Sequence, residues 1–453
     1  TDLVSARSRI EFLGAFESTY QPQHDVDIAE TTRHTSMWRE DLALLTTCGV
    51  SSLRYPVRWH RVEEAEGCYD WRHTDAVLDH LRDTGMRVVL DLCHHMSYPR
   101  WLAGGFADPR FGDAYLRFAE AVARRYPWMA GYTLFNEPFT TLFLAGSCAV
   151  FPPRLSGPEG FVRLTANVYP AVTEAARMYR DLVPKARYLH VDSCEQHDAA
   201  GPEGEEYTAL ANDRRFLLTD IMLGRHLDPD RPFLRELREA GGERLLEIRP
   251  GHIDVLGLDY YAHSQWQFSG WGRGIGGSPA PAPLADVIEN YWRRYGLECA
   301  IGETNIRGNP SDRASWLRYT LEQCEIAVAR GVNLTQYCWF PTVDSCDWSS
   351  LLVRSEGNVD PVGVFWVDSE WRRRSSSMSE SYARAAGGES ASSLPAYRFK
   401  PPVSRWLAGY APHVAHWDWV DPPGEAACTN APPVDDWVVF EVRAADADAS
   451  AAA

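Results

Sequence analysis

The hydrophobic positions of the chain fall into short, almost continuously apolar runs that alternate with longer stretches of helical spacing. Eight of these runs carry β-branched or aromatic residues and predict buried strands. They cover residues 11–18, 51–59, 86–95, 131–137, 186–194, 252–261, 297–303 and 332–340. Strands this apolar are typical of a parallel sheet whose outer face is covered by helices.

Amphipathic spacing between the runs predicts helices, several of which are followed by a glycine that ends them. These helices cover residues 35–48, 74–84, 111–126, 159–183, 213–224, 233–239, 284–295, 312–330 and 376–386, and a Gly-, Trp- and Pro-rich loop is expected over 264–283. Eight strand–helix units predict an α/β fold of the closed (β/α)8 TIM-barrel type. A doubly wound open sheet is the rival, but no Gly-rich phosphate loop follows the first strand.

The strand–helix rhythm ends near Gly387 and divides the chain into two predicted parts. Residues 1–387 are expected to form the barrel. Residues 388–453 are expected to form a C-terminal extension that packs on the barrel and finishes in a disordered Ala/Asp-rich end at 444–453. The extension either covers a barrel face or makes a contact between copies of the chain, so a homo-oligomer stays an open alternative.

Composition and charge narrow the class of protein. A hydrophobic fraction of 45% and a charged fraction of 24% over 453 residues are those of an ordinary globular protein, and the net charge of −17 argues against nucleic acid as a partner. No apolar run reaches the length of about 18 residues that a membrane span needs. The ten cysteines form no C-x-x-C pair and have no zinc-like spacing with histidine. We therefore expect buried thiols, a reducing, cytoplasmic location, and neither a metal nor another cofactor.

Two of the apolar runs end in a glutamate. The run at 131–137 ends in Asn136-Glu137-Pro138, and the run at 297–303 ends in Glu303. In a barrel of this kind the site lies at the carboxyl ends of the strands. One strand-terminal glutamate is more often a solvated cap, but two of them, far apart in sequence, are what a two-carboxylate glycosidase requires.

Other polar and aromatic residues stand at the predicted strand ends, which indicates a shared pocket. Each has a structural alternative: a strand-end histidine is often a satisfied core residue, an arginine can serve a structural ion pair, and a tryptophan can fill the core. The joint pattern is harder to explain in that way. The residues are Gln21, Arg54, His94, His95, Asn136, Tyr261 and Trp339, with Asp344, Asp347 and Trp348 after the eighth strand.

The same segments resemble, in chain order over roughly residues 11–387, motifs of glycoside hydrolase family 1. Residues 133–138 read TLFNEP and closely match the family's acid/base motif. Residues 301–305 read IGETN and resemble Ile-Thr-Glu-Asn-Gly around the nucleophile, and residues 257–261 read GLDYY and resemble Gly-Leu-Asn-Tyr-Tyr. Weaker resemblances lie at 14–21, 53–61, 93–102, 344–348 and 364–373.

The resemblance implies a retaining exo-β-glycosidase that acts on a small β-glycoside or oligosaccharide without a cofactor. Glu303 would be the nucleophile and Glu137 the general acid/base. Asn136 would hydrogen-bond the sugar 2-hydroxyl, and Arg54 with Tyr261 would hold the nucleophile ionised. The other hydroxyls would be held by Gln21, by His94 or His95, and by Asp347 and Trp348, with Trp339 as a platform.

The chain also departs from the family pattern, which leaves the substrate open. Gly302 stands where the family has Thr, residues 304–305 read Thr-Asn instead of Asn-Gly, Asp347 replaces a Glu, and Glu17 and Pro56 are unusual at their positions. A transglycosidase of the same family, and a carbohydrate-binding barrel that has lost turnover, remain alternatives. A 6-phosphoglycosidase is disfavoured, because Arg354 is the only basic residue after the eighth strand that is a candidate for binding the phosphate. An endo-acting enzyme is a weaker option.

Overall fold

Eight parallel strands close into a barrel in the order β1-β13-β12-β9-β7-β6-β5-β4. The computed structural model describes residues 3–7, 10–352 and 354–398, with positions 409, 410, 413, 418–422 and 424. Each predicted strand contains an observed one, so the predicted α/β (β/α)8 TIM barrel is confirmed. The barrel strands are β1 (Glu11–Ala15), β4 (Ser52–Pro56), β5 (Arg87–Asp91), β6 (Gly131–Thr133), β7 (Arg187–Ser193), β9 (Val255–Asp259), β12 (Glu298–Thr304) and β13 (Leu334–Trp339).

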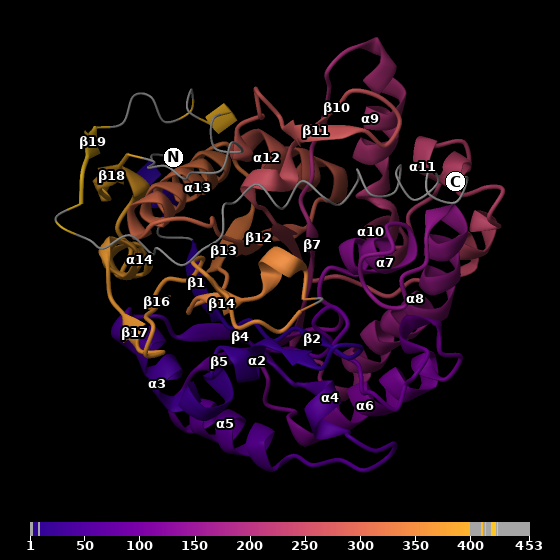
Figure 1. Cartoon of the computed structure of the whole chain (residues 1–453), viewed down its shortest axis with the longest axis horizontal. Helices are drawn as coiled ribbons and strands as arrows, with labels where there is room; N and C mark the ends of the chain where they lie inside the picture. Colours follow the sequence, from indigo (N-terminus) through magenta and orange to yellow (C-terminus); the bar gives the residue numbers. More distant parts are fainter. Residues whose placement is uncertain are drawn as a thin grey trace.

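Helices surround the barrel, and the two halves of the chain form opposite sides of it (Figure 1). In the closed order, β4, β5 and β6 therefore lie opposite β9, β12 and β13, which brings residues far apart in sequence to one rim. The predicted helices are found as α3 (His34–Thr47), α5 (Arg72–Asp83), α6 (Phe111–Arg125), α8 (Gly157–Leu182), α12 (Leu284–Tyr295), α13 (Pro310–Ala329) and α14 (Ser377–Ala386).

The structure differs from the local predictions at four places. The helix expected over 213–224 is split, because α9 (Pro202–Arg214) ends there and α10 (Leu217–Met222) starts after a turn; α11 (Pro232–Glu236) is shorter than expected. Helix α7 (Pro138–Gly146) was not predicted, since its almost wholly apolar sequence has no amphipathic pattern. The loop expected over 264–283 contains a hairpin of β10 (Trp266–Phe268) and β11 (Gly274–Gly277), whose glycines give little strand signal; β10 also pairs with β8 (Asp198–Ala199).

Shorter elements complete the described part of the chain and mostly lie in the loops. They are α1 (Leu3–Arg7), β2 (Tyr20–Gln21), β3 (Val26–Asp27), α2 (Ile28–Thr31), α4 (Trp59–Val62), β14 (Ser345–Cys346), β15 (Val359–Asp360), β16 (Trp366–Val367), β17 (Arg373–Arg374), β18 (Ala396–Tyr397) and β19 (Trp419–Val420). Several of them border the carboxyl-end rim, where the predicted site lies.

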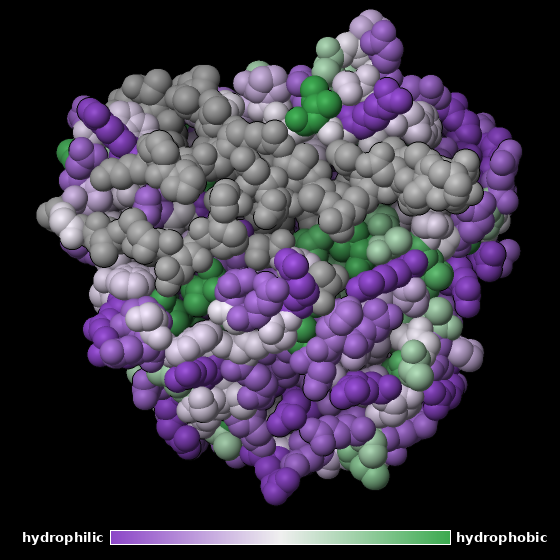
Figure 2. Space-filling model, viewed as in Figure 1, coloured by the Kyte–Doolittle hydropathy of each residue, from purple (hydrophilic) through white to green (hydrophobic). Residues whose placement is uncertain are grey.

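Apolar side chains fill the barrel and the layer between strands and helices. The inner cluster consists of Leu13, Ala15, Val89, Leu189, Val191, Val255, Ala300, Cys338 and Phe340. The surface in Figure 2 is mostly hydrophilic, and among the described residues the exposed large hydrophobic side chains are Leu246, Trp271, Ile275 and Val420. Within the described residues, no helix combines the length and the apolar character needed to cross a membrane. The interior is thus a packed scaffold that can hold side chains rigidly at its rim.

The described start of the predicted extension lies against α13. The carboxyl of Glu325 on that helix accepts hydrogen bonds from the Ser390 hydroxyl, at 2.8 Å, and from the Ala391 N–H, at 2.9 Å. Further along, the hydroxyl of Tyr410 contacts that of Tyr260. The division at residue 387 stays a prediction, and the predicted disordered end at 444–453 lies outside the described residues.

Helix α7 crosses α8 through two glycines, and this close approach carries a stability prediction. A Cβ at Gly160 would overlap the carbonyl oxygen of Gly146. We therefore expect Gly160→Ala to lower the free energy of unfolding by about 2 kcal/mol or more, measured by chemical denaturation. Gly112→Ala is the matched control, because its Cβ would meet Ala171 at an ordinary 3.7 Å. Equal stability of the two variants would contradict the close approach.

Candidate active site

The backbone around Glu137 is held in an unusual conformation. Glu137 joins β6 to α7 with φ 44° and ψ 61°, in the left-handed region, and Pro138 starts the helix. Such a conformation costs a non-glycine residue of order 1–3 kcal/mol and is found mostly at functional sites. The Glu137 N–H donates to the Val191 carbonyl at 3.1 Å, and the Glu137 carbonyl accepts from the Thr141 N–H at 2.8 Å. These bonds fix the strained turn that sends the carboxyl into the pocket.

Glu303 occupies the penultimate position of β12, opposite Asp259 of β9. The residue before it, Gly302, leaves no room for a side chain, because a Cβ there would overlap Oδ1 of Asp259 and lie 2.8 Å from Val191. The departure from the family's Thr at position 302 therefore makes space for the carboxyl of Asp259.

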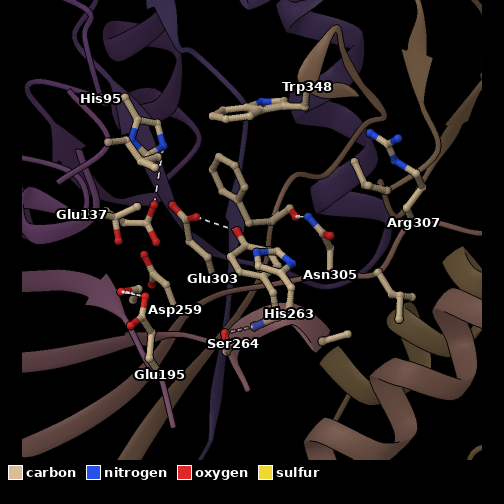
Figure 3. A pocket seen from close by; sticks show the side chains of 18 of the residues that line it. His95, Glu137, Glu195, Asp259, His263, Ser264, Glu303, Asn305, Arg307 and Trp348 are labelled. Atoms are coloured by element: carbon tan, nitrogen blue, oxygen red, sulfur yellow. Dashed lines mark hydrogen bonds and ion pairs between the residues drawn. The ribbon is translucent and has the colours of Figure 1, made fainter. Parts of the chain in front are cut away.

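Three carboxyl groups converge at the carboxyl-end rim. One oxygen each of Glu137, Asp259 and Glu303 lie within 4.8 Å of one another. Figure 3 shows Glu137 and Glu303 side by side, with Asp259 approaching from a third direction. The exposed fractions are 7% for Glu137, 2% for Glu303 and 0% for Asp259, so the cluster is almost completely removed from water.

Of the three carboxyl groups, that of Glu303 forms an ion pair with an arginine. Nη1 of Arg54 lies 3.0 Å from Oε1 of Glu303, and the Tyr261 hydroxyl donates to Oε2 at 2.7 Å. Arg54 is itself held by Asp91, at 3.0 Å, and by Oδ1 of Asn136, at 2.7 Å. The guanidinium is thus fixed from two further strands and favours the ionised form of Glu303.

Among the described residues, no arginine or lysine forms an ion pair with Glu137. Burial, and then the negative charge of Glu303, raise the pKa of the Glu137 carboxyl well above its ordinary value. The nearest ring nitrogen is Nε2 of His95, at 3.6 Å, but burial lowers the pKa of His95 well below its usual range, so this imidazole is neutral. Burial also raises the pKa of Glu303, while Arg54, His94 and the Tyr261 hydroxyl oppose it. These contacts favour a protonated Glu137 and an ionised Glu303.

A cavity of about 220 Å³ opens above the carboxyls. Its wall includes His95, Tyr261, Trp348 and Glu17, and an apolar part formed by Phe139, Phe143, Phe151 and Trp266. The Trp348 indole N–H donates to Oε2 of Glu17 at 3.0 Å, which fixes the plane of the ring. Ligand pockets usually measure about 300–1,000 Å³, so this cavity suits a small ligand.

The structure brings together five of the residues predicted for the site. Glu137, Glu303, His95, Tyr261 and Trp348 line the cavity. Arg54, His94 and Asn136 lie directly behind this wall: Arg54 bonds Glu303, Asn136 contacts His95, and Nε2 of His94 lies 3.5 Å from Glu17. Of the two histidines between which the sequence leaves the choice open, His95 lines the cavity, whereas His94 Nδ1 is 2.8 Å from Asp91 and its ring stacks on Phe340.

Three predicted sugar contacts do not line the cavity, because their side chains have other partners. The carboxyl of Asp347 accepts backbone N–H groups of residues 356–358. Oε1 of Gln21 accepts the N–H groups of Gln23 and His24. The indole of Trp339 is fully buried and donates to the Val362 carbonyl at 2.9 Å, while the next residue, Phe340, reaches the wall.

The residues of the cavity wall that were not predicted for the site include Asp259, Glu17 and Glu195. Asp259 had a signal, since it stands where the GLDYY segment departs from the family's Asn. Glu17 differs from the family pattern at its position, but that difference alone does not predict a role in the site. Glu195 follows β7, has its carboxyl 2.9 Å from Nε2 of His197, and carried no sequence signal.

A buried pair of carboxyls at the rim of a (β/α)8 barrel defines a class of two-carboxylate enzymes, and solved structures agree on the fold. The β-glucosidase from Thermotoga maritima in complex with isofagomine lactam superposes with a TM-score of 0.69, at 19% identity, over 79% of this chain and 87% of that chain. At this identity the likeness shows the fold alone.

The profile described as glycosyl hydrolase family 1 matches residues 11–268, which include Glu137 and end before Glu303. The chain belongs to glycosyl hydrolase family 1, whose members include β-glucosidase-like and β-galactosidase-like enzymes, and it is an O-glycosyl hydrolase.

Several similar proteins carry the names of glycosidases. A 1,4-beta-D-glucan glucohydrolase of Thermotoga neapolitana is 20% identical over 384 residues, which cover 75% of this chain and 87% of the relative. A beta-galactosidase of Saccharolobus solfataricus is 21% identical over 319 residues, covering 61% of this chain and 63% of the relative. An aryl-phospho-beta-D-glucosidase of Bacillus subtilis is 32% identical over 272 residues, or 54% of each chain.

Proposed function

We propose that the protein is a retaining exo-β-glycosidase that removes one sugar unit through a covalent glycosyl-enzyme. The observation that carries this proposal is the short separation of Glu137 and Glu303. One carboxyl oxygen of Glu137 lies within 4.8 Å of one carboxyl oxygen of Glu303. Retaining glycosidases place their carboxyls about 5–5.5 Å apart, whereas inverting ones need about 6.5–9.5 Å to admit a water.

In the first step an oxygen of Glu303 attacks the anomeric carbon. Glu137 gives its proton to the glycosidic oxygen, the bond between that oxygen and the anomeric carbon breaks, and the aglycone leaves as an alcohol. Arg54 and Tyr261 hold Glu303 ionised and oriented before the attack.

In the second step the roles of the carboxyls change. Glu303 is now an uncharged ester, so the negative charge that raised the pKa of Glu137 is gone and that pKa falls. Glu137, now a carboxylate, takes a proton from water, the oxygen of that water attacks the anomeric carbon, and the ester bond breaks. Glu303 leaves as a carboxylate and the sugar is released with retained configuration.

The substrate we propose is a β-glucoside or β-galactoside with an apolar aglycone. His95 and the Glu17–Trp348 pair offer polar groups to sugar hydroxyls, and Phe139, Phe143 and Trp266 offer an apolar surface. The related Thermotoga maritima enzyme has been solved with deoxynojirimycin and with galacto-hydroximolactam, which supports a small sugar ligand here. Direct sugar contacts of Gln21, Trp339 and Asp347 stay a prediction that this side-chain arrangement does not favour.

The test is the stereochemistry of the product. We expect an aryl β-glucoside or β-galactoside to release its phenol, with the β-anomer of the sugar formed first by proton NMR. An α-anomer formed first would contradict retention. A panel of aryl β-glycosides with no release would favour a carbohydrate-binding barrel, and added alcohol captured as a glycoside would show transglycosylation.

The pH dependence of kcat/KM gives a further prediction. Loss of the hydroxyl in Tyr261→Phe removes a hydrogen bond that lowers the pKa of Glu303. The acid limb, where Glu303 must lose its proton, should therefore move to higher pH, by about one unit. Tyr260→Phe is the matched control, because its hydroxyl contacts Gln265 and Tyr410 and not the carboxyl pair. An acid limb that stays in place in Tyr261→Phe would contradict this role.

A further inference from the structure

Asp259 is a buried carboxyl of the reaction centre that the two-carboxylate mechanism does not use. Its side chain is 0% exposed, and neither of its carboxyl oxygens has a hydrogen-bond partner among the described residues. It lines the same cavity as Glu137 and Glu303, and its carboxyl points to theirs (Figure 3). A buried ionised carboxylate without a partner is very costly, so this carboxyl requires an explanation.

Few positive charges are available to the three carboxyls. Arg54 bonds Glu303 and also Asp91. His94, whose pKa is raised despite burial by the neighbouring Asp91 and Glu17 carboxyls, lies 2.8 Å from Asp91 and 3.5 Å from Glu17. Neutral His95 adds no charge. The other titratable groups around Asp259 add negative charge or none; from the neighbouring elements they are Asp192 and Cys194 of the β7 segment, Tyr261 after β9, and Cys338 of β13. Arg54 and His94 are thus shared with the carboxyls of Asp91 and Glu17, which leaves positive charge for one carboxylate of the cluster, and we expect the other two carboxyls to hold protons.

We propose that Asp259 is a positioning residue that stays a neutral carboxylic acid and donates its hydroxyl hydrogen to whichever of Glu137 and Glu303 is ionised. This inference rests on the proposed function, in which Glu303 is the carboxylate before glycosyl transfer and Glu137 is the carboxylate afterwards. Asp259 reaches both, because oxygens of all three groups lie within 4.8 Å. Donation needs a small side-chain rotation or one bridging water.

No proton is transferred by Asp259 in this scheme. Its O–H turns toward Glu303 in the free protein and toward Glu137 in the glycosyl-enzyme, so each charged state has one neutral donor at the floor of the pocket. An amide could donate in the same way, and the family motif that the GLDYY segment resembles has Asn at this position. Burial, and then the charges of Glu303 and Glu137, raise the pKa of Asp259 well above its ordinary value, in agreement with the neutral form.

The decisive experiment is infrared spectroscopy, which separates the C=O stretch of a carboxylic acid from the bands of a carboxylate. In a Glu137→Gln background, which removes the other expected acid, we compare Asp259 with Asp259→Asn near neutral pH. We expect the substitution to remove a carboxylic-acid band. Loss of carboxylate intensity instead would overturn the proposal. The readout does not need turnover, so it fails or succeeds independently of the proposed glycosidase activity.

Steady-state kinetics of two Asp259 variants provide a second test of the proposal. Asp259→Ala removes the donor and should lower kcat/KM by about 10- to 100-fold. Asp259→Asn should restore it to within about threefold of wild type and leave the acid limb in place, since one neutral group replaces another. If Asp259 is ionised, Asp259→Asn should instead move the acid limb to lower pH, because a negative charge beside Glu303 has been lost. That shift, or competitive inhibition by Mn²⁺ that Asp259→Asn abolishes, would overturn the proposal.

Discussion

Replacing Glu303 by Gln should lower kcat/KM for an aryl β-glycoside by about 10⁴-fold or more, the largest effect of any single substitution in the chain. The amide keeps the size and most contacts of the side chain, but it cannot form the covalent bond to the anomeric carbon. Losses of this order follow the removal of a nucleophile in enzymes that act through covalent intermediates. The measurement is steady-state release of the phenol, with folding checked by circular dichroism.

Glu195→Gln is the matched control for this substitution. Glu195 is another carboxyl of the same cavity and is partly buried, but it is paired with His197 and is not one of the three converging groups. We expect its loss to cost less than about 100-fold in kcat/KM, the loss that mispositioning can cause. Equal losses in the two variants would mean that Glu303 acts only through the charge of the pocket.

Replacing Glu137 by Ala should change kcat/KM by an amount that depends on the leaving group of the substrate. For a poor leaving group, which needs a proton from Glu137, we expect kcat/KM to fall by about 10²- to 10⁴-fold, the usual contribution of a general acid. For a dinitrophenyl glycoside, which leaves without a proton, the first step should be nearly unaffected and the glycosyl-enzyme should accumulate, because water has lost its base.

Rescue of the Glu137→Ala variant by azide is a second measurement of the same role. A small anion can enter the space left by the side chain and attack the anomeric carbon without a general base. We expect azide to accelerate turnover of the dinitrophenyl glycoside by Glu137→Ala, and the product to be the β-glycosyl azide. An α-azide, or equal losses for good and poor leaving groups, would remove Glu137 from the acid/base role.

The barrel and the carboxyl pair could be predicted from the sequence because both depend on local pattern. Continuous apolar runs specify buried parallel strands, and Glu137 and Glu303 end two of them. Once eight such strands close, both carboxyls must reach the same rim. Arg54 follows for the same reason, since it lies inside β4 and points toward the barrel axis, where it meets Glu303 at 3.0 Å.

The sugar contacts were harder to predict because loops position them. Asp347 has φ 61° in the left-handed region and accepts N–H groups from residues up to eleven positions later, which no strand pattern reveals. The choice of His95 over His94 depends on where β5 ends, at Asp91, and on a positive φ at His95. The sequence shows Asp259 as a departure from the family motif within GLDYY. Its place beside Gly302 and Glu137 could not be predicted, because these residues come together only in the folded barrel.

In the proposed mechanism Glu303 bonds to the sugar during turnover, and a slow substrate makes this bond observable. A 2-deoxy-2-fluoro-β-glycoside with a dinitrophenyl leaving group reacts once and then releases its sugar slowly, because fluorine destabilises both positively charged transition states. After proteolysis and mass spectrometry, we expect the fluorosugar on the peptide that contains Glu303, and none in Glu303→Gln. A label on Glu137 or Asp259, or steady turnover of ordinary glycosides with no label at all, would contradict the account.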